Sequence, residues 1–216
     1  MTTLTTILPL ALRDTALTVT ELADEAAPRD TFAMFRKKCL EQVTRLREEF
    51  LAAGHPPAVV EDAAYAQCAL LDEYALRRLT GDERSAWERE PLQVQEFQSH
   101  NAGEELIARI ERRLAEAQPV IPLLVVFHAV LGLGFQGKFA LEGNAARDAL
   151  VHTIDERLQR AGVQKTTGPV IVTAGKMRGW RGLSPLAWVA IALVGAGLVY
   201  FALDRWLAVS IARLAS

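Results

Sequence analysis

Cysteine, surplus positive charge and strand-like patterning are all scarce in this sequence. Two cysteines in 216 residues cannot build a disulfide-stabilised scaffold. The 24 basic and 26 acidic side chains leave a formal charge of −2, so no excess of positive charge can track phosphates, and we predict no nucleic-acid partner. No stretch of useful length alternates between apolar and polar residues, so we predict no sheet.

Charged residues are absent from residues 183–203, LSPLAWVAIALVGAGLVYFAL. At about 1.5 Å per residue, this run spans roughly 31 Å as a helix, close to the hydrocarbon thickness of a bilayer. The alternative is a helix buried on every side in a large core, which a protein of this size cannot provide. We therefore predict a transmembrane helix at 183–203, with the lipid bilayer as a partner.

The charges that flank this run predict its orientation. Residues 1–163 hold 18 basic and 25 acidic side chains, whereas residues 164–182 hold four basic side chains and no acid. Basic residues beside a membrane span favour the cytoplasmic side. We therefore predict a cytoplasmic domain at 1–163, a basic glycine-containing linker at 164–182, and a short tail at 204–216 across the membrane.

The body of the chain shows helical periodicity throughout, which predicts an all-α bundle. Asp30 and Gly54 bound one predicted helix over 31–53, and Pro57 opens another over 58–79. A loop containing Trp87 and Pro91 follows. Further helices are predicted over 103–117, 119–135 and 145–161, with a weakly patterned one within 4–26. Of these, the almost wholly apolar segment 119–135 is expected to be the central buried helix. Asn101 with Glu104, and Asn144, are the expected caps.

The glycines at 132, 134 and 137 fit the GxGxxG pattern of dinucleotide-binding loops. Such a loop needs a strand before it and a helix after it, and here the preceding apolar run is too long for an ordinary strand. The alternative is a helix C-terminus that ends at glycines. A membrane-tethered nucleotide-binding enzyme therefore stays as a second hypothesis beside a non-enzymatic scaffold.

Asp72 is the most informative polar residue, because it falls in the middle of an apolar helical arc. A carboxylate in that position needs a partner or stays partly wet. It is either a structural ion pair or loop cap, or an acid exposed in a cleft for a partner protein. Glu73 points outward from the arc and is expected to be more exposed.

Catalytic and metal-binding patterns are missing. The four histidines form no i,i+4 pair, and no Walker loop or GxSxG motif occurs. We predict no catalytic residue, no cofactor and no metal. Cys39 and Cys68 fall in helical patterns and are expected to be reduced core thiols.

Four short segments resemble a known family in their order and spacing. YAQCALLDE at 65–73, Trp87, AGE at 102–104 and LGFQGKF at 133–139 resemble motifs of the DotU/TssL proteins of type VI and type IVb secretion. The predicted C-terminal membrane helix agrees with that family, and the resemblance covers about residues 30–203. Ala102 replaces a glycine, and Leu106-Ile107 stands where an aromatic pair is common.

The resemblance implies a hook-shaped cytoplasmic domain built of two small helical bundles. It also implies a structural subunit of a type VI secretion membrane complex in the bacterial inner membrane, with the N-terminus cytoplasmic and the C-terminus periplasmic. The implied partners are an IcmF/TssM-like membrane protein and the cytoplasmic baseplate, with Asp72 and Glu73 at the domain's cleft. The alternative is a type IVb DotU-like stabiliser of an IcmF-like protein.

Small residues in the predicted span favour close helix packing. Ala192 and Ala196 lie four positions apart, with Gly195 and Gly197 beside them. Small side chains let a second helix approach closely in the bilayer. We therefore expect helix association there, and a homo-oligomer.

Overall fold

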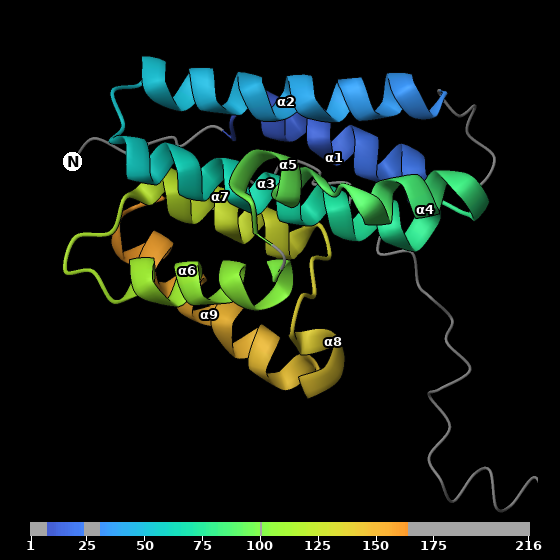
Figure 1. The fold of residues 1–216 in the computed structure, drawn as a ribbon. Helices are drawn as coiled ribbons and strands as arrows, with labels where there is room; N and C mark the ends of the chain where they lie inside the picture. Colours follow the sequence, from blue (N-terminus) through green and yellow to red (C-terminus); the bar gives the residue numbers. More distant parts are fainter. Residues whose placement is uncertain (1–7, 24–30, 100, 164–216) are drawn as a thin grey trace, which may run out of the picture. The chain divides into compact units, whose positions relative to one another are not determined.

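The computed structural model describes residues 8–23, 31–99 and 101–163, all of which belong to one compact unit, Met1–Val170. These residues form helices and no strand, which confirms the all-α prediction for this part of the chain (Figure 1). Seven of the helices have nine residues or more, and two are shorter. In chain order they are α1 (Leu10–Ala23), α2 (Phe32–Ala52), α3 (Pro57–Arg78), α4 (Gly81–Arg89), α5 (Leu92–Phe97), α6 (Ala102–Leu114), α7 (Ile121–Gly132), α8 (Phe139–Glu142) and α9 (Asn144–Arg160).

Most predicted helices are confirmed, and the differences lie at their ends. Helix α3 begins at Pro57. Proline has no amide proton, but no hydrogen bond is lost at this position because the first amides of a helix have no acceptor within it. Helix α2 is capped by Thr31, whose side chain accepts a hydrogen bond from the Met34 amide, and not by Asp30. Helix α9 follows Gly143, so Asn144 is its first residue and not its cap.

Three helices, α4, α5 and α8, form in segments that were not predicted to be helical. Trp87 lies in α4, where it is the one buried residue of nine. A single buried apolar side chain gives no repeating apolar pattern, so the sequence did not indicate this helix. Residues 139–142 form the single turn of α8. The predicted capping box of α6 also differs, because the Asn101 side-chain nitrogen donates to Glu104 at 2.7 Å and neither side chain caps a backbone amide.

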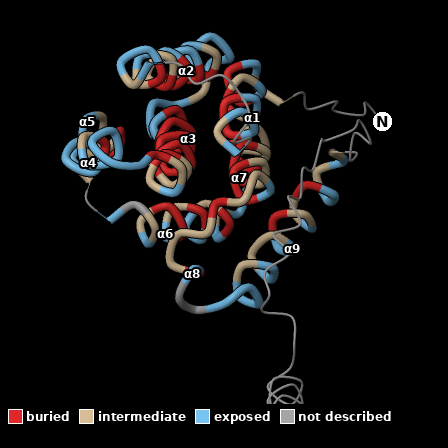
Figure 2. The backbone as a smooth tube through the Cα atoms, turned by 90° about the vertical axis from the view of Figure 1, so that its right-hand side faces the viewer, coloured by how far each residue is buried: buried red, intermediate tan, exposed pale blue. Residues whose placement is uncertain are grey.

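The central helix is α3, and not the segment 119–135 as predicted. Fourteen of its 22 residues are buried, and it packs against α1, α2, α4, α5, α6 and α7 (Figure 2). Five of the buried residues are alanines, whose small side chains let neighbouring helices approach on several sides. Helix α7 is buried on one side only, through residues such as Phe127 and Val130.

Two clusters of buried apolar side chains surround α3. The larger one joins α3 to α1, α6, α7, α9 and the C-terminal half of α2, and the smaller one joins it to the N-terminal half of α2, to α4 and to α5 around Trp87. Cys39 and Cys68 are both unpaired and fully buried in the smaller cluster, as predicted. Burial raises the pKa of the Cys39 thiol to about 12 and that of Cys68 well above its usual value, so both stay unreactive thiols.

The predicted membrane helix at 183–203 lies outside the described residues, as do the linker and the tail. Within the described ranges, no helix is both long enough and apolar enough to span a bilayer. The positions predicted for membrane packing, Ala192, Gly195, Ala196 and Gly197, therefore stay predictions.

Candidate functional site

The C-terminal half of α3 carries the two acidic residues singled out in the sequence. Asp72 faces α4 and α5, whereas Glu73 faces the loop that follows α7. Neighbouring positions on a helix point about 100° apart, so one acidic dipeptide can hold two separate segments. The site is the set of contacts that these carboxylates make.

Asp72 is buried, with 3% of its surface exposed. Its Oδ1 accepts hydrogen bonds from the indole Nε1 of Trp87 and the amide of Leu92, each at 2.8 Å, and its Oδ2 accepts one from the amide of Gln93 at 2.9 Å. Leu92 and Gln93 open α5, so a buried carboxylate caps that helix and ties it to α4. These are the contacts of a loop cap, one of the two interpretations left open by the sequence.

Burial and hydrogen bonding act on Asp72 in opposite directions. Removal from water raises the pKa of its carboxyl, while the three donors favour the ionised form and lower it, and the net pKa is about 6 against the ordinary 3.8. Arg36 also lowers this pKa, and its guanidinium lies over the Trp87 ring. This net pKa lies below 7, so the carboxylate is mostly ionised at neutral pH.

Glu73 is less exposed than expected, with 17% of its side chain accessible. Its carboxylate accepts hydrogen bonds from the amide of Gln136 at 2.9 Å and from the amide of Gly137 at 2.8 Å, and it pairs with Arg77 one turn later on α3. The GxGxxG segment therefore uses its amides to bind a carboxylate of the same chain. It follows helix α7 and no strand, so the structural context of a dinucleotide loop is missing here.

Other side chains clamp the same loop from both sides. The Tyr74 hydroxyl donates to the Leu133 carbonyl at 2.7 Å. From α9, Arg147 Nε donates to the Phe135 carbonyl at 3.0 Å, and Arg147 also bonds the Leu131 carbonyl. Three backbone carbonyls at the end of α7 are satisfied in this way, which sequence patterns did not predict.

Glycines let α6 approach this loop closely. A Cβ added to Gly103 would lie 3.0 Å from the Gly137 Cα, and one added to Gly137 would lie 2.7 Å from the Gly103 carbonyl oxygen. Gly137 also has a φ of +50°, which favours glycine. The AGE segment at 102–104 and the LGFQGKF segment at 133–139 are therefore in direct backbone contact.

The four segments that carry the family resemblance thus meet in space. Residues 65–73 supply the acidic pair, Trp87 and the start of α5 bind Asp72, and the two glycine-containing segments meet beside Glu73. Segments up to 64 positions apart in sequence form one connected network of polar and backbone contacts.

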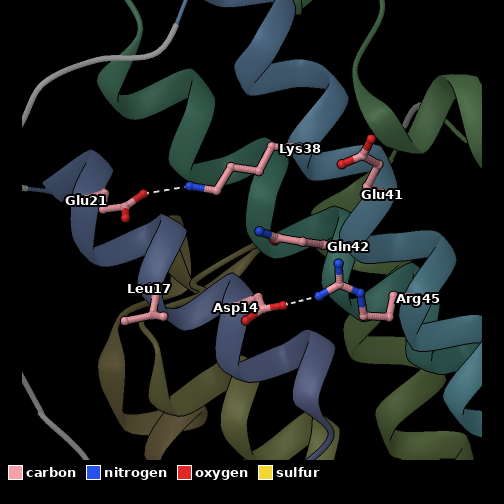
Figure 3. Close-up of a pocket in the computed structure, with 7 residues that line it drawn as sticks. All are labelled: Asp14, Leu17, Glu21, Lys38, Glu41, Gln42 and Arg45. Carbon is pink, nitrogen blue, oxygen red and sulfur yellow. Dashed lines mark hydrogen bonds and ion pairs between the residues drawn. The ribbon is translucent and has the colours of Figure 1, made fainter.

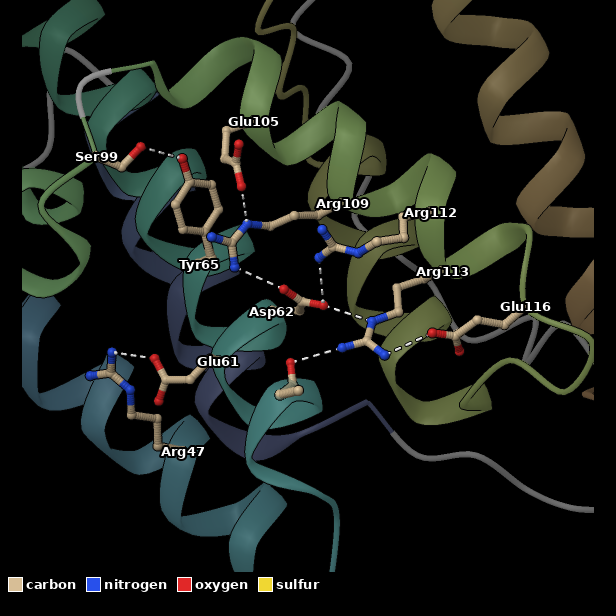
Figure 4. Close-up of polar contacts among 11 residues, drawn as sticks. Arg47, Glu61, Asp62, Tyr65, Ser99, Glu105, Arg109, Arg112, Arg113 and Glu116 are labelled. Atoms are coloured by element: carbon tan, nitrogen blue, oxygen red, sulfur yellow. Dashed lines mark hydrogen bonds and ion pairs between the residues drawn. The ribbon is translucent and has the colours of Figure 1, made fainter.

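A second charged cluster joins α3 to α6 and was missed in the sequence. Asp62 is 3% exposed, and its carboxylate accepts from Arg109 at 2.8 Å and from Arg113 at 2.7 Å, with Arg112 at 3.6 Å (Figure 4). Arg109 also lies over the Tyr65 ring, 4.0 Å from its centroid. The spacing of Arg109 and Arg113, one turn apart on a helix, was the signal available in the sequence.

In the described part of the chain, no group of three or more His, Cys, Asp or Glu side chains lies close enough to hold a metal ion. Asp72 and Glu73 instead bind indole and backbone N–H groups.

The fold and the site together define a helical structural domain whose acidic residues organise its own loops. Comparison with known proteins then identifies the family. The sequence model of type VI secretion system protein DotU matches residues 8–206, so the chain belongs to the DotU family. It is therefore a structural component of a secretion system. No curated protein matches the chain.

Solved structures agree with this assignment. SciP/TssL of the type VI secretion system of enteroaggregative Escherichia coli 042 is 30% identical, with a TM-score of 0.60 over 78% of this chain and 96% of that one. The cytoplasmic domain of TssL from Acinetobacter baumannii is 27% identical, with a TM-score of 0.62 over 69% of this chain and 95% of that one. DotU from Francisella novicida, 18% identical with a TM-score of 0.55 over 68% of this chain and 94% of that one, shares the fold.

Proposed function

We propose that this chain is a non-enzymatic inner-membrane subunit of a type VI secretion membrane complex, which joins an IcmF/TssM-like protein to the cytoplasmic baseplate. The observation that carries the proposal is the extent of the family match, which runs from residue 8 to residue 206 and so includes the apolar run at 183–203. The helical domain and the expected anchor thus belong to one family architecture, for which we also propose the two-bundle, hook-like form.

The physical role of the anchor is to confine the acidic helical domain to the cytoplasmic membrane face. Confinement raises the effective concentration of the domain toward membrane-bound partners without any new contact. Extraction of membranes with carbonate tests this step. The full chain should stay in the membrane pellet, and a cysteine in the tail at 204–216 should react with a membrane-impermeant reagent from the periplasm. Release into the supernatant, or labelling of the helical domain from outside, would overturn the topology.

We propose that Asp72 and Glu73 serve baseplate docking by shaping the surface and not by touching the partner. Asp72 holds α4 and α5 in place, and Glu73 holds the 132–137 loop, so both segments present a fixed backbone beside α3. Co-purification of baseplate proteins with the full chain provides the test. Glu73→Ala should lower recovery, whereas Glu111→Ala, which removes one acid from an exposed position of α6, should not.

We propose that the membrane helix contacts the IcmF/TssM-like partner. Ala192→Leu with Ala196→Leu fills the space that small residues leave for a second helix, and should weaken co-purification with that partner. Val189→Leu with Val199→Leu is the matched control, because it adds the same kind of bulk at positions that are already branched. If both double variants recover equal amounts of the IcmF/TssM-like partner, the proposed packing of the membrane helix is wrong.

Two alternatives from the sequence have distinct tests. A type IVb DotU-like stabiliser would raise the level of an IcmF-like protein without recovering baseplate subunits. A nucleotide-binding enzyme would be stabilised against heat by NAD or ATP. The contacts of Glu73 with the glycine loop favour the scaffold over this second alternative, because the amides that would face a phosphate already bind a carboxylate.

A further inference from the structure

One end of the domain, at the left of Figure 1, gathers the starts of α1, α3 and α7 and the ends of α2, α6 and α9. The described chain also ends here, at Val163, and the predicted membrane helix begins 20 positions later. We call this surface the exit end, and it consists of residues 8–13, 51–58, 115–122 and 158–163.

Three charged side chains join the segments of the exit end to one another. Glu49 on α2 accepts hydrogen bonds from the first two amides of α1, at 2.9 and 3.0 Å. Arg113 donates to the Ala58 carbonyl at 3.0 Å, and Arg157 donates to the Leu114 carbonyl at 3.2 Å. These contacts join α1 to α2, α6 to α3 and α9 to α6, so separate stretches of sequence form one surface.

The exit end itself carries few charges. Its 28 residues include three charged side chains, Arg13, Glu116 and Arg160, against 50 in the 216 residues of the whole chain. Glu116 pairs with Arg113 at 2.8 Å, and Arg160 pairs with Glu156 at 2.9 Å but keeps 63% of its side chain exposed. Arg13 is exposed and has no ion pair among the described residues. The net charge of the four segments is therefore small and positive.

Exposed apolar side chains lie on this charge-poor surface. Leu10 is 63% exposed and Leu51 is 56% exposed, and they are two of the four large apolar side chains that are exposed among the described residues. Residues 51–58 include no Asp, Glu, Lys or Arg, and seven of these eight residues are exposed. Apolar side chains on a surface depleted of charge mark an interaction site.

The same two helices are highly charged away from the exit end. Five charged side chains of α1 and α2 line a pocket of about 200 Å³ (Figure 3): Asp14, Glu21, Lys38, Glu41 and Arg45. Lys38 pairs with Glu21 at 2.8 Å, and Arg45 pairs with Asp14. The charge-poor surface is therefore a local feature of the exit end and not a property of these helices as a whole.

We propose that the exit end lies on the anionic cytoplasmic surface of the membrane, with Leu10 and Leu51 among the lipid headgroups and Arg13 and Arg160 near lipid phosphates. Apolar side chains beside arginines are the pattern of an interfacial membrane contact. The inference rests on the proposed membrane anchor, because the contact area is small and works only where the anchor raises the local concentration of the domain.

The chain that follows the exit end supports a lipid surface as the occupant. Residues 164–182 span at most about 65 Å even when fully extended, so the anchor keeps the exit end near the bilayer. They hold four basic side chains and no acid, which continues the positive sign of the exit end toward the membrane. Basic residues beside a membrane span attract anionic lipids.

Fluorescence of the full-length protein in vesicles tests the contact. Ala52→Cys, at the exit end of α2, is labelled with the environment-sensitive fluorophore NBD, and Ala33→Cys, an equally exposed alanine at the other end of α2, is the matched control. Cys39 and Cys68 are fully buried and do not compete for the label. In vesicles of equal parts phosphatidylglycerol and phosphatidylcholine, spin-labelled lipid should quench the probe at position 52 about threefold more than the probe at position 33.

Replacing the apolar side chains tests which residues make the contact. Leu10→Gln with Leu51→Gln should lower quenching at position 52 about threefold, because amide side chains do not enter the headgroup region as leucines do. Leu17→Gln with Met34→Gln also replaces one exposed apolar side chain on each helix, but away from the exit end, and should leave quenching unchanged. Equal effects of the two double variants would overturn the proposal.

Charge reversal tests the attraction to anionic lipid. Arg13→Glu with Arg160→Glu should lower quenching at position 52 about threefold, and vesicles of phosphatidylcholine alone should lower it likewise. Arg84→Glu with Arg89→Glu is the matched control, because α4 offers one arginine that pairs with a glutamate one turn away and one that has no ion pair among the described residues. Equal quenching in both kinds of vesicle would overturn the role of the arginines.

Flotation of the same vesicles separates this inference from the proposed anchor. Protein that does not float with the vesicles would refute the anchor. Protein that floats but shows equal quenching at positions 33 and 52 would overturn the lipid contact alone, and would leave the exit end as a surface for a protein partner.

Discussion

Glu73 and Gly137 are joined by a hydrogen bond of 2.8 Å, from the glycine amide to the glutamate Oε2, across 64 positions of sequence. The glycine loop after α7 therefore closes around a carboxylate that its own chain provides. Gly137 can take this position because its φ of +50° and its contact with Gly103 both suit glycine. The acidic pair of α3 thereby determines where the flanking loops lie.

Glu73→Ala should loosen the 132–137 loop without unfolding the domain. Its loss leaves the amides of Gln136 and Gly137 without an acceptor, which costs about 1–3 kcal/mol of unfolding free energy at this half-buried site. Hydrogen exchange should accelerate at these two amides. Glu111→Ala should leave exchange unchanged, and equal protection in both variants would contradict the role given to Glu73.

Asp72→Ala should destabilise the domain more than Glu73→Ala. It leaves the Trp87 indole and two α5 amides buried without an acceptor, and we expect a loss of about 3–5 kcal/mol. Trp87 fluorescence and urea denaturation provide the measurement. A loss below that of Glu73→Ala would show that water replaces the carboxylate.

Asp72 should also make stability depend on pH. Its pKa is about 6 in the folded state and 3.8 when exposed to water, so the folded state binds the proton more tightly. The stability from this protonation is fully present below about pH 3.8 and is lost as pH rises through about 6. Relative to Asp72→Asn, the wild-type unfolding free energy should fall by about 2 kcal/mol between pH 4 and pH 7. A parallel pH profile for both proteins would contradict the burial argument.

Gly137→Ala should be strongly destabilising, because the new Cβ would lie 2.7 Å from the Gly103 carbonyl and 2.9 Å from the Phe135 ring. We expect a cost of about 2–4 kcal/mol from this clash and the positive φ. Gly132→Ala is the matched control in the same motif, since a Cβ there meets nothing within 4 Å. It should be neutral or stabilising in thermal unfolding. Equal losses would show that the contact of α6 with the loop is not tight.

The sequence singled out some residues of the site, but it could not show which groups those residues bind. Asp72 stood out because a carboxylate interrupts an apolar arc, and burial with three donors explains that placement. Glu73 was expected to face outward, because a single-helix projection cannot show a loop that returns 63 positions later to cover it. The arginine cluster around Asp62 was missed for the same reason, since its members come from two helices.

The sequence by itself determined the helical class, most helix positions and the family resemblance, because periodicity, prolines and glycines act over a few neighbouring residues. Only the tertiary structure decided that α3 is the central helix and that Asp72 and Glu73 face different segments of the same domain. The physical reason is that burial and hydrogen-bond partners depend on which distant segments pack together. Alanine-rich α3 could therefore be recognised as the core only once six neighbouring helices surrounded it.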